Sequence, residues 1–115
     1  MSAIALKQEE TENLFIYGTL AFKEVQRSLF KRLVPTEEDS LKNYSKDHIR
    51  LPDIPEGSIY PILKFTGNPE DEVKGHVLKI TRHELTFTDA YEGESYLRKQ
   101  VNLKSGLEAW CYVAP

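Results

Sequence analysis

Residues 14–20 read Leu14-Phe15-Ile16-Tyr17-Gly18-Thr19-Leu20, and this segment decides the fold. Its first four residues are apolar or aromatic, and Gly18 ends the run, which is typical of a buried strand followed by a turn. A strand that ends in Gly-Thr exposes consecutive backbone N–H groups, which can bind a carboxylate or an oxyanion without a basic side chain. On the spacing alone, an ordinary tight turn is the simpler interpretation.

Two short helices are predicted farther along the chain. Residues 23–33 have apolar side chains at intervals of four, which gives a helix one apolar face. Residues 81–91 begin with the capping box Thr81-x-x-Glu84, in which each side chain bonds a backbone N–H group of the other residue. Gly93 follows the last turn, where a helix end favours a left-handed residue.

The other segments predict a mostly antiparallel sheet. The expected strands cover residues 41–44, 48–51, 60–65, 73–80, 96–103 and 107–113. Two prolines and a glycine predict a loop at 52–57, and Gly67-Asn68-Pro69 and Lys104-Ser105-Gly106 predict turns. The expected fold class is α+β, a small mixed, barrel-like sheet with two short helices.

The composition indicates one globular domain. The chain has 115 residues, of which 40% are hydrophobic, enough for a core and too many for a disordered chain. We expect a loose lead-in over residues 1–12, where charged residues cluster, and a single domain over 13–115. The net charge of -3 lacks the basic surplus that nucleic-acid binding needs.

The sequence predicts a cytoplasmic protein without a membrane span. The longest uncharged stretch, residues 13–22, is about half of the ~20 residues that a spanning helix needs. Residues 1–6 are too short for the apolar region of a signal peptide. Cys111 is the single cysteine and has no partner for an intrachain disulfide, which fits a reducing compartment.

Common catalytic motifs are missing from the sequence. The three histidines, His48, His76 and His83, lack the spacing of metal ligands. The sequence contains no Gly-x-Ser-x-Gly elbow, phosphate-binding loop or dinucleotide glycine pattern. We therefore expect neither a metal nor a cofactor.

The second informative segment is residues 88–98, which read Thr-Asp-Ala-Tyr-Glu-Gly-Glu-Ser-Tyr-Leu-Arg. Glu92 would lie in the last turn of the second helix, where the helix dipole raises the pKa of a carboxylate. Arg98 could oppose this effect or border a cavity, but the favoured interpretation is that it pairs with an acid such as Asp89. On spacing alone, a solvated acidic loop is again the simpler interpretation.

Together the two segments resemble the γ-glutamylcyclotransferase-like superfamily, in particular its AIG2-like branch. The resemblance covers about residues 14–113. The motifs that carry it are Tyr17-Gly18-Thr19-Leu20, Asp89-x-x-Glu92-Gly93, Tyr96-x-Arg98, Glu24-Val25-Gln26 with Leu29-Phe30, Tyr60-Pro61 and Val73-x-Gly75-x-Val77.

The resemblance implies a closed or nearly closed sheet around a cavity that binds a small γ-glutamyl substrate. It implies that Glu92 is the general acid/base and that the substrate-binding residues are Tyr17, Gly18, Thr19 and Leu20, largely through backbone amides. Tyr96 is a further candidate for substrate binding, whereas Tyr60 and Tyr91 are expected in the core or at the rim. The implied reaction, of transferase or lyase type, releases 5-oxoproline without a metal or cofactor.

Two departures from the family pattern concern the mouth of the pocket. The loop after Leu20 reads Ala21-Phe22-Lys23 instead of a basic residue followed by glycine, and the chain ends at Pro115. We therefore expect an altered, more open pocket.

Two other functions stay open: a non-catalytic module that binds a small molecule, and an interaction domain with an apolar patch around Leu29 and Phe30. No oligomeric state is predicted.

Overall fold

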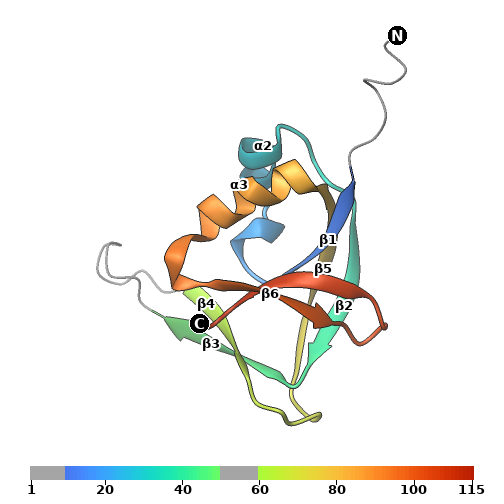
Figure 1. The fold of residues 1–115 in the computed structure, drawn as a ribbon, viewed down its shortest axis with the longest axis vertical. Helices are drawn as coiled ribbons and strands as arrows, with labels where there is room; N and C mark the ends of the chain where they lie inside the picture. Colours follow the sequence, from blue (N-terminus) through green and yellow to red (C-terminus); the bar gives the residue numbers. More distant parts are fainter. Residues whose placement is uncertain (1–9, 50–59) are drawn as a thin grey trace.

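The computed structural model describes residues 10–49 and 60–115 and has the predicted α+β architecture (Figure 1). The strands are β1 (Thr11–Ile16), β2 (Thr36–Lys42), β3 (Tyr44–Ile49), β4 (Tyr60–Phe65), β5 (Glu72–Thr81), β6 (Leu97–Asn102) and β7 (Glu108–Val113). The helices are α2 (Lys23–Phe30) and α3 (Arg82–Glu92), with 3-10 turns η1 (Thr19–Ala21) and η2 (Gly93–Ser95). The predicted lead-in up to residue 9, the predicted loop at 52–57 and the end of the predicted strand 48–51 lie outside the described residues.

The sheet is mostly antiparallel, as predicted. Five strands pair in the order β2-β5-β1-β7-β6, and β3 and β4 form a separate ribbon. The central pair β1–β7 is parallel, whereas the other pairs are antiparallel.

Backbone hydrogen bonds outside the ladders give the sheet its barrel-like shape. The N–H of Ala114 donates to the carbonyl of Leu63 (2.9 Å) and joins the end of β7 to β4. The N–H of Lys104, in the β6–β7 turn, donates to the carbonyl of Ser40 (2.8 Å) on β2. The two edges of the five-stranded sheet are therefore connected, and the β3–β4 ribbon covers one of its faces.

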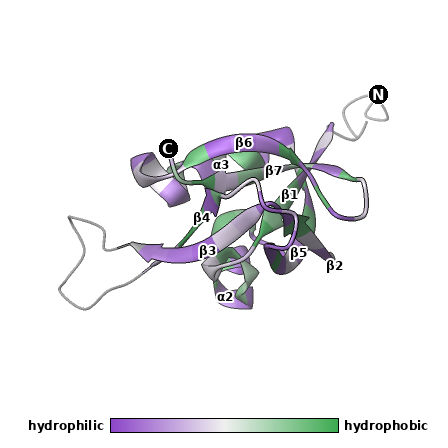
Figure 2. Ribbon diagram, turned by 90° about the horizontal axis from the view of Figure 1, so that it is seen from below, coloured by the Kyte–Doolittle hydropathy of each residue, from purple (hydrophilic) through white to green (hydrophobic). Residues whose placement is uncertain are grey.

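Strand β1 separates two hydrophobic cores. Because side chains alternate along a strand, Phe15 faces the core beneath the ribbon, whereas Leu14 and Ile16 face the core beneath the helices. All three side chains are fully or almost fully buried. Figure 2 shows the hydrophobic residues concentrated in the central strands, while β3 is largely hydrophilic. Burial on both faces holds the end of β1 in place.

Helix α2 is shorter than predicted. It ends at Phe30 because Lys31 adopts a left-handed conformation (φ 60°, ψ 24°), so the predicted end at Leu33 is wrong. Phe30 is only 6% exposed, and Leu29 packs against the core beneath the helices. The apolar patch expected of an interaction domain is therefore not present at these two residues.

Strands β2 and β3 are longer than the predicted segments 41–44 and 48–51. Strand β2 carries three consecutive acidic residues and buries only Leu41, yet it pairs with β5 along its whole length. Asn43, with a φ of 72°, separates β2 from β3, and its carbonyl accepts hydrogen bonds from the N–H groups of Thr66 and Gly67. The ends of β2 and β3 are therefore set by pairing with neighbouring strands and not by the weak local sequence pattern. Strand β1 likewise begins two residues before the predicted start of the domain at residue 13.

Helix α3 begins with the predicted capping box. The N–H of Glu84 donates to Thr81 Oγ1 (3.0 Å), and the N–H of Thr81 donates to Glu84 Oε1 (2.9 Å). Arg32 forms a bidentate ion pair with the same carboxylate, at 2.7 and 2.9 Å. The helix runs to Glu92 and stops at Gly93. No helix within residues 10–49 and 60–115 is long and apolar enough to cross a membrane.

Candidate active site

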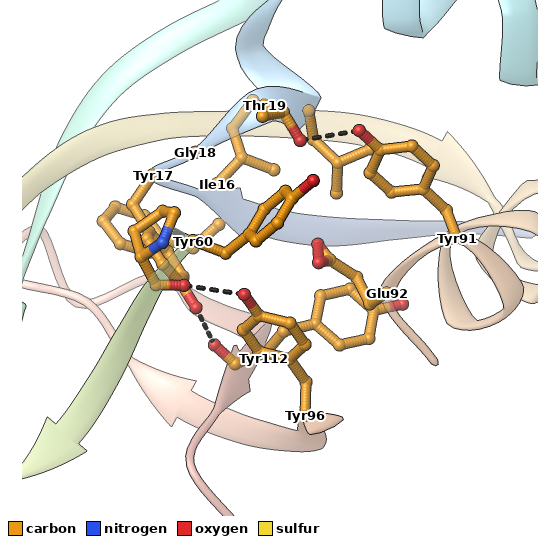
Figure 3. A pocket seen from close by; sticks show the side chains of 12 residues that line it. Ile16, Tyr17, Gly18, Thr19, Tyr60, Tyr91, Glu92, Tyr96 and Tyr112 are labelled. Carbon is orange, nitrogen blue, oxygen red and sulfur yellow. Dashed lines mark hydrogen bonds between the residues drawn. The ribbon is translucent and has the colours of Figure 1, made fainter. Parts of the chain in front are cut away.

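A pocket of about 210 Å³ lies where the end of β1, the start of β4 and the end of α3 meet (Figure 3). Of the residues that the structure describes, Glu92 is the only charged one in its lining. Five of the six tyrosines in the chain also line it. The complete lining is Phe15, Ile16, Tyr17, Gly18, Thr19, Leu20, Tyr60, Pro61, Tyr91, Glu92, Tyr96 and Tyr112.

Glu92 extends into the pocket from the last turn of α3 (Figure 3). Burial among aromatic side chains disfavours the charged carboxylate and raises its pKa from 4.5 to about 7. Within the described part of the chain, the carboxylate accepts no hydrogen bond and has no ion-pair partner. Glu92 can therefore exchange protons with a ligand near neutral pH.

The loop after β1 brings backbone donors to the same pocket. The N–H groups of Ala21 and Phe22 donate to the carbonyls of Gly18 (3.0 Å) and Thr19 (2.9 Å). The N–H groups of Gly18, Thr19 and Leu20 have no such acceptor among residues 10–49 and 60–115. Three consecutive donors are thus available to an anionic ligand group.

Gly18 packs closely against β4. A Cβ atom at this position would lie 3.1 Å from Cγ of Pro61, which is tighter than ordinary van der Waals contact. The missing side chain lets the loop approach the strand that begins at Tyr60. This contact fixes one wall of the pocket.

Most tyrosine hydroxyls in the lining are engaged with other protein groups. Tyr17 Oη donates to the carbonyl of Tyr112 (2.5 Å), and Tyr91 Oη shares a hydrogen bond of 2.6 Å with Thr19 Oγ1. Tyr96 lines the pocket, and its hydroxyl donates to the carbonyl of Pro61 (2.8 Å). Burial, followed by the charge of Glu92, raises the pKa of Tyr96 to about 12, so this phenol stays protonated.

Arg98 lies outside the pocket and pairs with Asp89, as the favoured interpretation predicted. The Nε–Oδ1 distance is 2.8 Å, and the guanidinium lies 4.3 Å from the centre of the Trp110 ring. Tyr112 Oη donates to the same Asp89 oxygen (2.7 Å). This cluster connects the end of α3 to β6 and β7, one turn before Glu92.

The described residues contain no group of three histidine, cysteine, aspartate or glutamate side chains suited to a metal ion. Cys111 is fully buried, and burial raises the pKa of its thiol. The site therefore offers a carboxyl group, backbone donors and phenols.

A family model described as gamma-glutamyl cyclotransferase, AIG2-like, matches residues 14–115. The chain belongs to this family. The match begins at the first residue of the segment that decides the fold and includes every described residue that lines the pocket. No curated protein sequence matches the chain.

Solved structures share the fold of this cyclotransferase family member. A protein described as gamma-glutamyl cyclotransferase superposes with a TM-score of 0.77 at 18% identity, over 92% of this chain and 68% of that one. A human protein described as uncharacterized gives 0.76 at 19% identity, over 93% and 68% of the two chains. At these identities the likeness concerns the fold alone.

Two Arabidopsis thaliana proteins with solution structures also share this fold. One has a TM-score of 0.73 at 24% identity, over 94% of this chain and 71% of that one. The other has a TM-score of 0.68 at 22% identity, over 93% of this chain. The chain spans only 64% of the length of that second protein.

All six predicted site residues of this family member line one pocket. Tyr60 and Tyr91, expected in the core or at the rim, also line it, and Tyr112 is a lining residue that the sequence did not indicate. The motif Tyr60-Pro61 was noted only as part of the resemblance. It could have indicated a pocket residue, because a tyrosine at the start of a strand lies at the edge of the sheet, where loops meet.

Proposed function

We propose that the protein is an enzyme that releases 5-oxoproline from a γ-glutamyl amine or a γ-glutamyl amino acid. The observation that carries this proposal is Glu92, a carboxyl group with a pKa of about 7 in an otherwise uncharged aromatic pocket. Membership of the family supports the class of reaction. A cytoplasmic location, which fits the single cysteine, belongs to the same proposal.

In a γ-glutamyl compound, the α-amine attacks the γ-carbonyl carbon of its own molecule and closes a five-membered ring. The nucleophile and the electrophile are already connected, so the reaction does not have to bring two molecules together. Intramolecular geometry of this kind contributes several kcal/mol to catalysis. The pocket has to hold the folded-back conformer and move protons.

Glu92 is the proton carrier in this proposal. Its carboxylate accepts a proton from the α-ammonium group, and the resulting amine attacks the γ-carbon. The carboxyl group then gives a proton to the leaving nitrogen while the ring nitrogen loses its second proton. The products are 5-oxoproline and the free amine, which takes up the remaining proton. A single positioned carboxyl group of matched pKa typically contributes ~10²–10⁴-fold to such transfers.

The free N–H groups of Gly18, Thr19 and Leu20 bind the α-carboxylate of the substrate in this proposal. No lysine, arginine or histidine in the described lining competes for that anion. A cluster of consecutive N–H groups suits a fully charged carboxylate, since it offers several donors at once. The cavity of about 210 Å³ is small beside the ~300–1,000 Å³ of typical ligand pockets, so it holds the glutamyl part and leaves the amine outside.

Release of 5-oxoproline tests the proposal directly. The protein is incubated with γ-glutamyl amides of methylamine, alanine, a diamine and the side-chain amine of lysine, and 5-oxoproline is measured by mass spectrometry. Release by the wild-type protein that is lost in Glu92→Gln supports the proposal. Glu94→Gln is the matched control, because Glu94 is exposed and does not line the pocket.

Absence of release from the folded wild-type protein would contradict the proposal for these substrates. A thermal-shift measurement with the same amides then tests the alternative of a binding module. A compound that raises the melting temperature without being converted binds the native state and is not a substrate.

A further inference from the structure

We infer that the hydroxyl group of Tyr60 donates a hydrogen bond to the γ-carbonyl oxygen of the substrate and stabilises the oxyanion that forms there. This inference rests on the proposed function. It adds a catalytic residue that the sequence analysis placed in the core or at the rim.

The tyrosine hydroxyls in the pocket differ in their hydrogen-bond partners. Four of the five bond to protein groups: Tyr17 to a carbonyl, Tyr91 to Thr19, Tyr96 to a carbonyl and Tyr112 to Asp89. Tyr60 Oη has no hydrogen-bond partner within residues 10–49 and 60–115. As far as residues 10–49 and 60–115 are concerned, Tyr60 is therefore the one of these five phenols that is available to a ligand.

Tyr60 also occupies a suitable position in the pocket. It is the first residue of β4, and Figure 3 shows its ring and the Glu92 side chain extending into the pocket from opposite sides. The next residue, Pro61, contacts Gly18 and accepts the hydrogen bond of Tyr96. The backbone that carries Tyr60 is thus fixed between the donor loop and the strand that follows Glu92.

The charges of the substrate favour the same role for Tyr60. The substrate presents two oxygen-bearing groups, a fully charged carboxylate and a carbonyl that becomes charged only during the reaction. The three consecutive N–H groups of the loop suit the carboxylate. The carbonyl oxygen then needs a separate donor close to the group that handles the reacting amines, which is Glu92. A neutral phenol opposite Glu92 meets this need.

Formation and collapse of the oxyanion do not require transfer of the phenolic proton of Tyr60. As the amine lone pair forms the new C–N bond, the π electrons of the carbonyl move onto its oxygen. At that stage Glu92 holds the proton taken from the ammonium group and is neutral, so it does not repel the oxyanion. When the carbonyl re-forms, the C–N bond to the leaving amine breaks, and Tyr60 keeps its proton throughout.

Tyr60→Phe tests the inference, because it removes the hydroxyl group and keeps the ring. The kinetics use the amide from the panel that the wild-type protein converts fastest. We expect kcat to fall about 100-fold, as on loss of other oxyanion donors, while KM changes by less than about threefold. Tyr44→Phe is the matched control, since it loses the same group from a buried tyrosine outside the pocket lining and should leave both constants unchanged.

The outcomes separate this inference from the proposed function. Wild-type activity with an unchanged kcat in Tyr60→Phe would overturn the role of Tyr60 and leave the proposed function standing. A rise in KM at constant kcat would also overturn it, because the bond would then act on the bound substrate and the transition state equally. If the wild-type protein releases no 5-oxoproline from any amide, the proposed function and this inference both fail.

Discussion

The hydroxyl of Tyr112 donates a hydrogen bond of 2.7 Å to the carboxylate of Asp89 and so ties β7 to the last turns of α3. Arg98 bonds the same oxygen at 2.8 Å. Because Glu92 lies one turn beyond Asp89, this cluster fixes the direction in which Glu92 leaves the helix. The backbone carbonyl of Tyr112 also accepts the hydrogen bond of Tyr17, so one residue supports both walls of the pocket.

Loss of the Tyr112 hydroxyl should therefore destabilise the protein. Tyr112 is almost completely buried, and its hydroxyl bonds both Asp89 and Thr88. We expect Tyr112→Phe to lower the free energy of unfolding by about 1–3 kcal/mol, measured by urea denaturation. Tyr60→Phe, which loses no bond to a described residue, should change it by less than about 0.5 kcal/mol. Equal effects of the two variants would contradict this account of the cluster.

The activity should depend on the ionisation of Glu92. The proposed reaction starts from its carboxylate, and burial raises the pKa of this group to about 7. Therefore kcat/KM for 5-oxoproline release should rise with pH and reach its midpoint near 7. A pH series from about 3.5 to about 8.5 tests this expectation. A midpoint near the ordinary value of 4.5 would show that the essential group is not a buried carboxyl.

The same pKa makes a separate prediction about stability. The folded state holds the proton of Glu92 more tightly than the unfolded chain, whose ordinary value is 4.5. Below pH 4.5, Glu92 is protonated in both the folded and the unfolded state and does not lower the free energy of unfolding. Between 4.5 and about 7 the unfolded state releases its proton first, so stability falls as the pH rises, and above 7 the full cost is present.

Glu92→Gln should remove this cost. Urea denaturation gives the difference in the free energy of unfolding between Glu92→Gln and the wild-type protein at each pH. This difference should favour the variant by about 2–3 kcal/mol more at pH 8 than at pH 4.5. Glu94→Gln should show no such dependence on pH, because Glu94 is exposed. A constant difference between Glu92→Gln and wild type at both pH values would disprove the burial of a charged carboxyl.

Gly75 should not tolerate a side chain. A Cβ atom there would lie 2.3 Å from the carbonyl oxygen of Ile16 and 2.7 Å from the ring of Phe15. Gly75→Ala therefore has to displace the end of β1, and we expect it to lower the free energy of unfolding by about 1–3 kcal/mol or more. Lys74→Ala, at an exposed neighbouring position, should cost less than about 0.5 kcal/mol. A thermal melt of both variants compares them, and a stable Gly75→Ala protein would refute the close packing.

The sequence could predict those features that depend on neighbouring residues. The end of β1, the capping box at Thr81 and the pairing of Arg98 with Asp89 each depend on residues fewer than ten positions apart. The position of Glu92 at the end of α3 follows from the same local signals. The resemblance to a family then brought Glu92 and the loop at Gly18 together, which spacing alone could not do.

Features that depend on distant partners could not be predicted in this way. Strand β2 carries three consecutive acidic residues and buries only Leu41, so its length is set by pairing with β5 and not by its own pattern. The position of Tyr60 depends on the contact between Pro61 on β4 and Gly18 in the loop after β1, which are far apart in the sequence. A tyrosine in a pocket and a tyrosine in the core have similar local sequence signals, so Tyr112 is recognised as a lining residue only in three dimensions.

The parallel pairing of β1 with β7 has a consequence for the order of folding. The first strand takes its central place only when the last strand lies beside it, and the bond between Tyr17 and Tyr112 spans 95 residues. Contacts so distant along the chain are formed late and slow the folding of a small domain. During synthesis on the ribosome, the wall of the pocket that Tyr112 provides is missing until β7 has emerged. The pocket and the centre of the sheet therefore both depend on the arrival of β7.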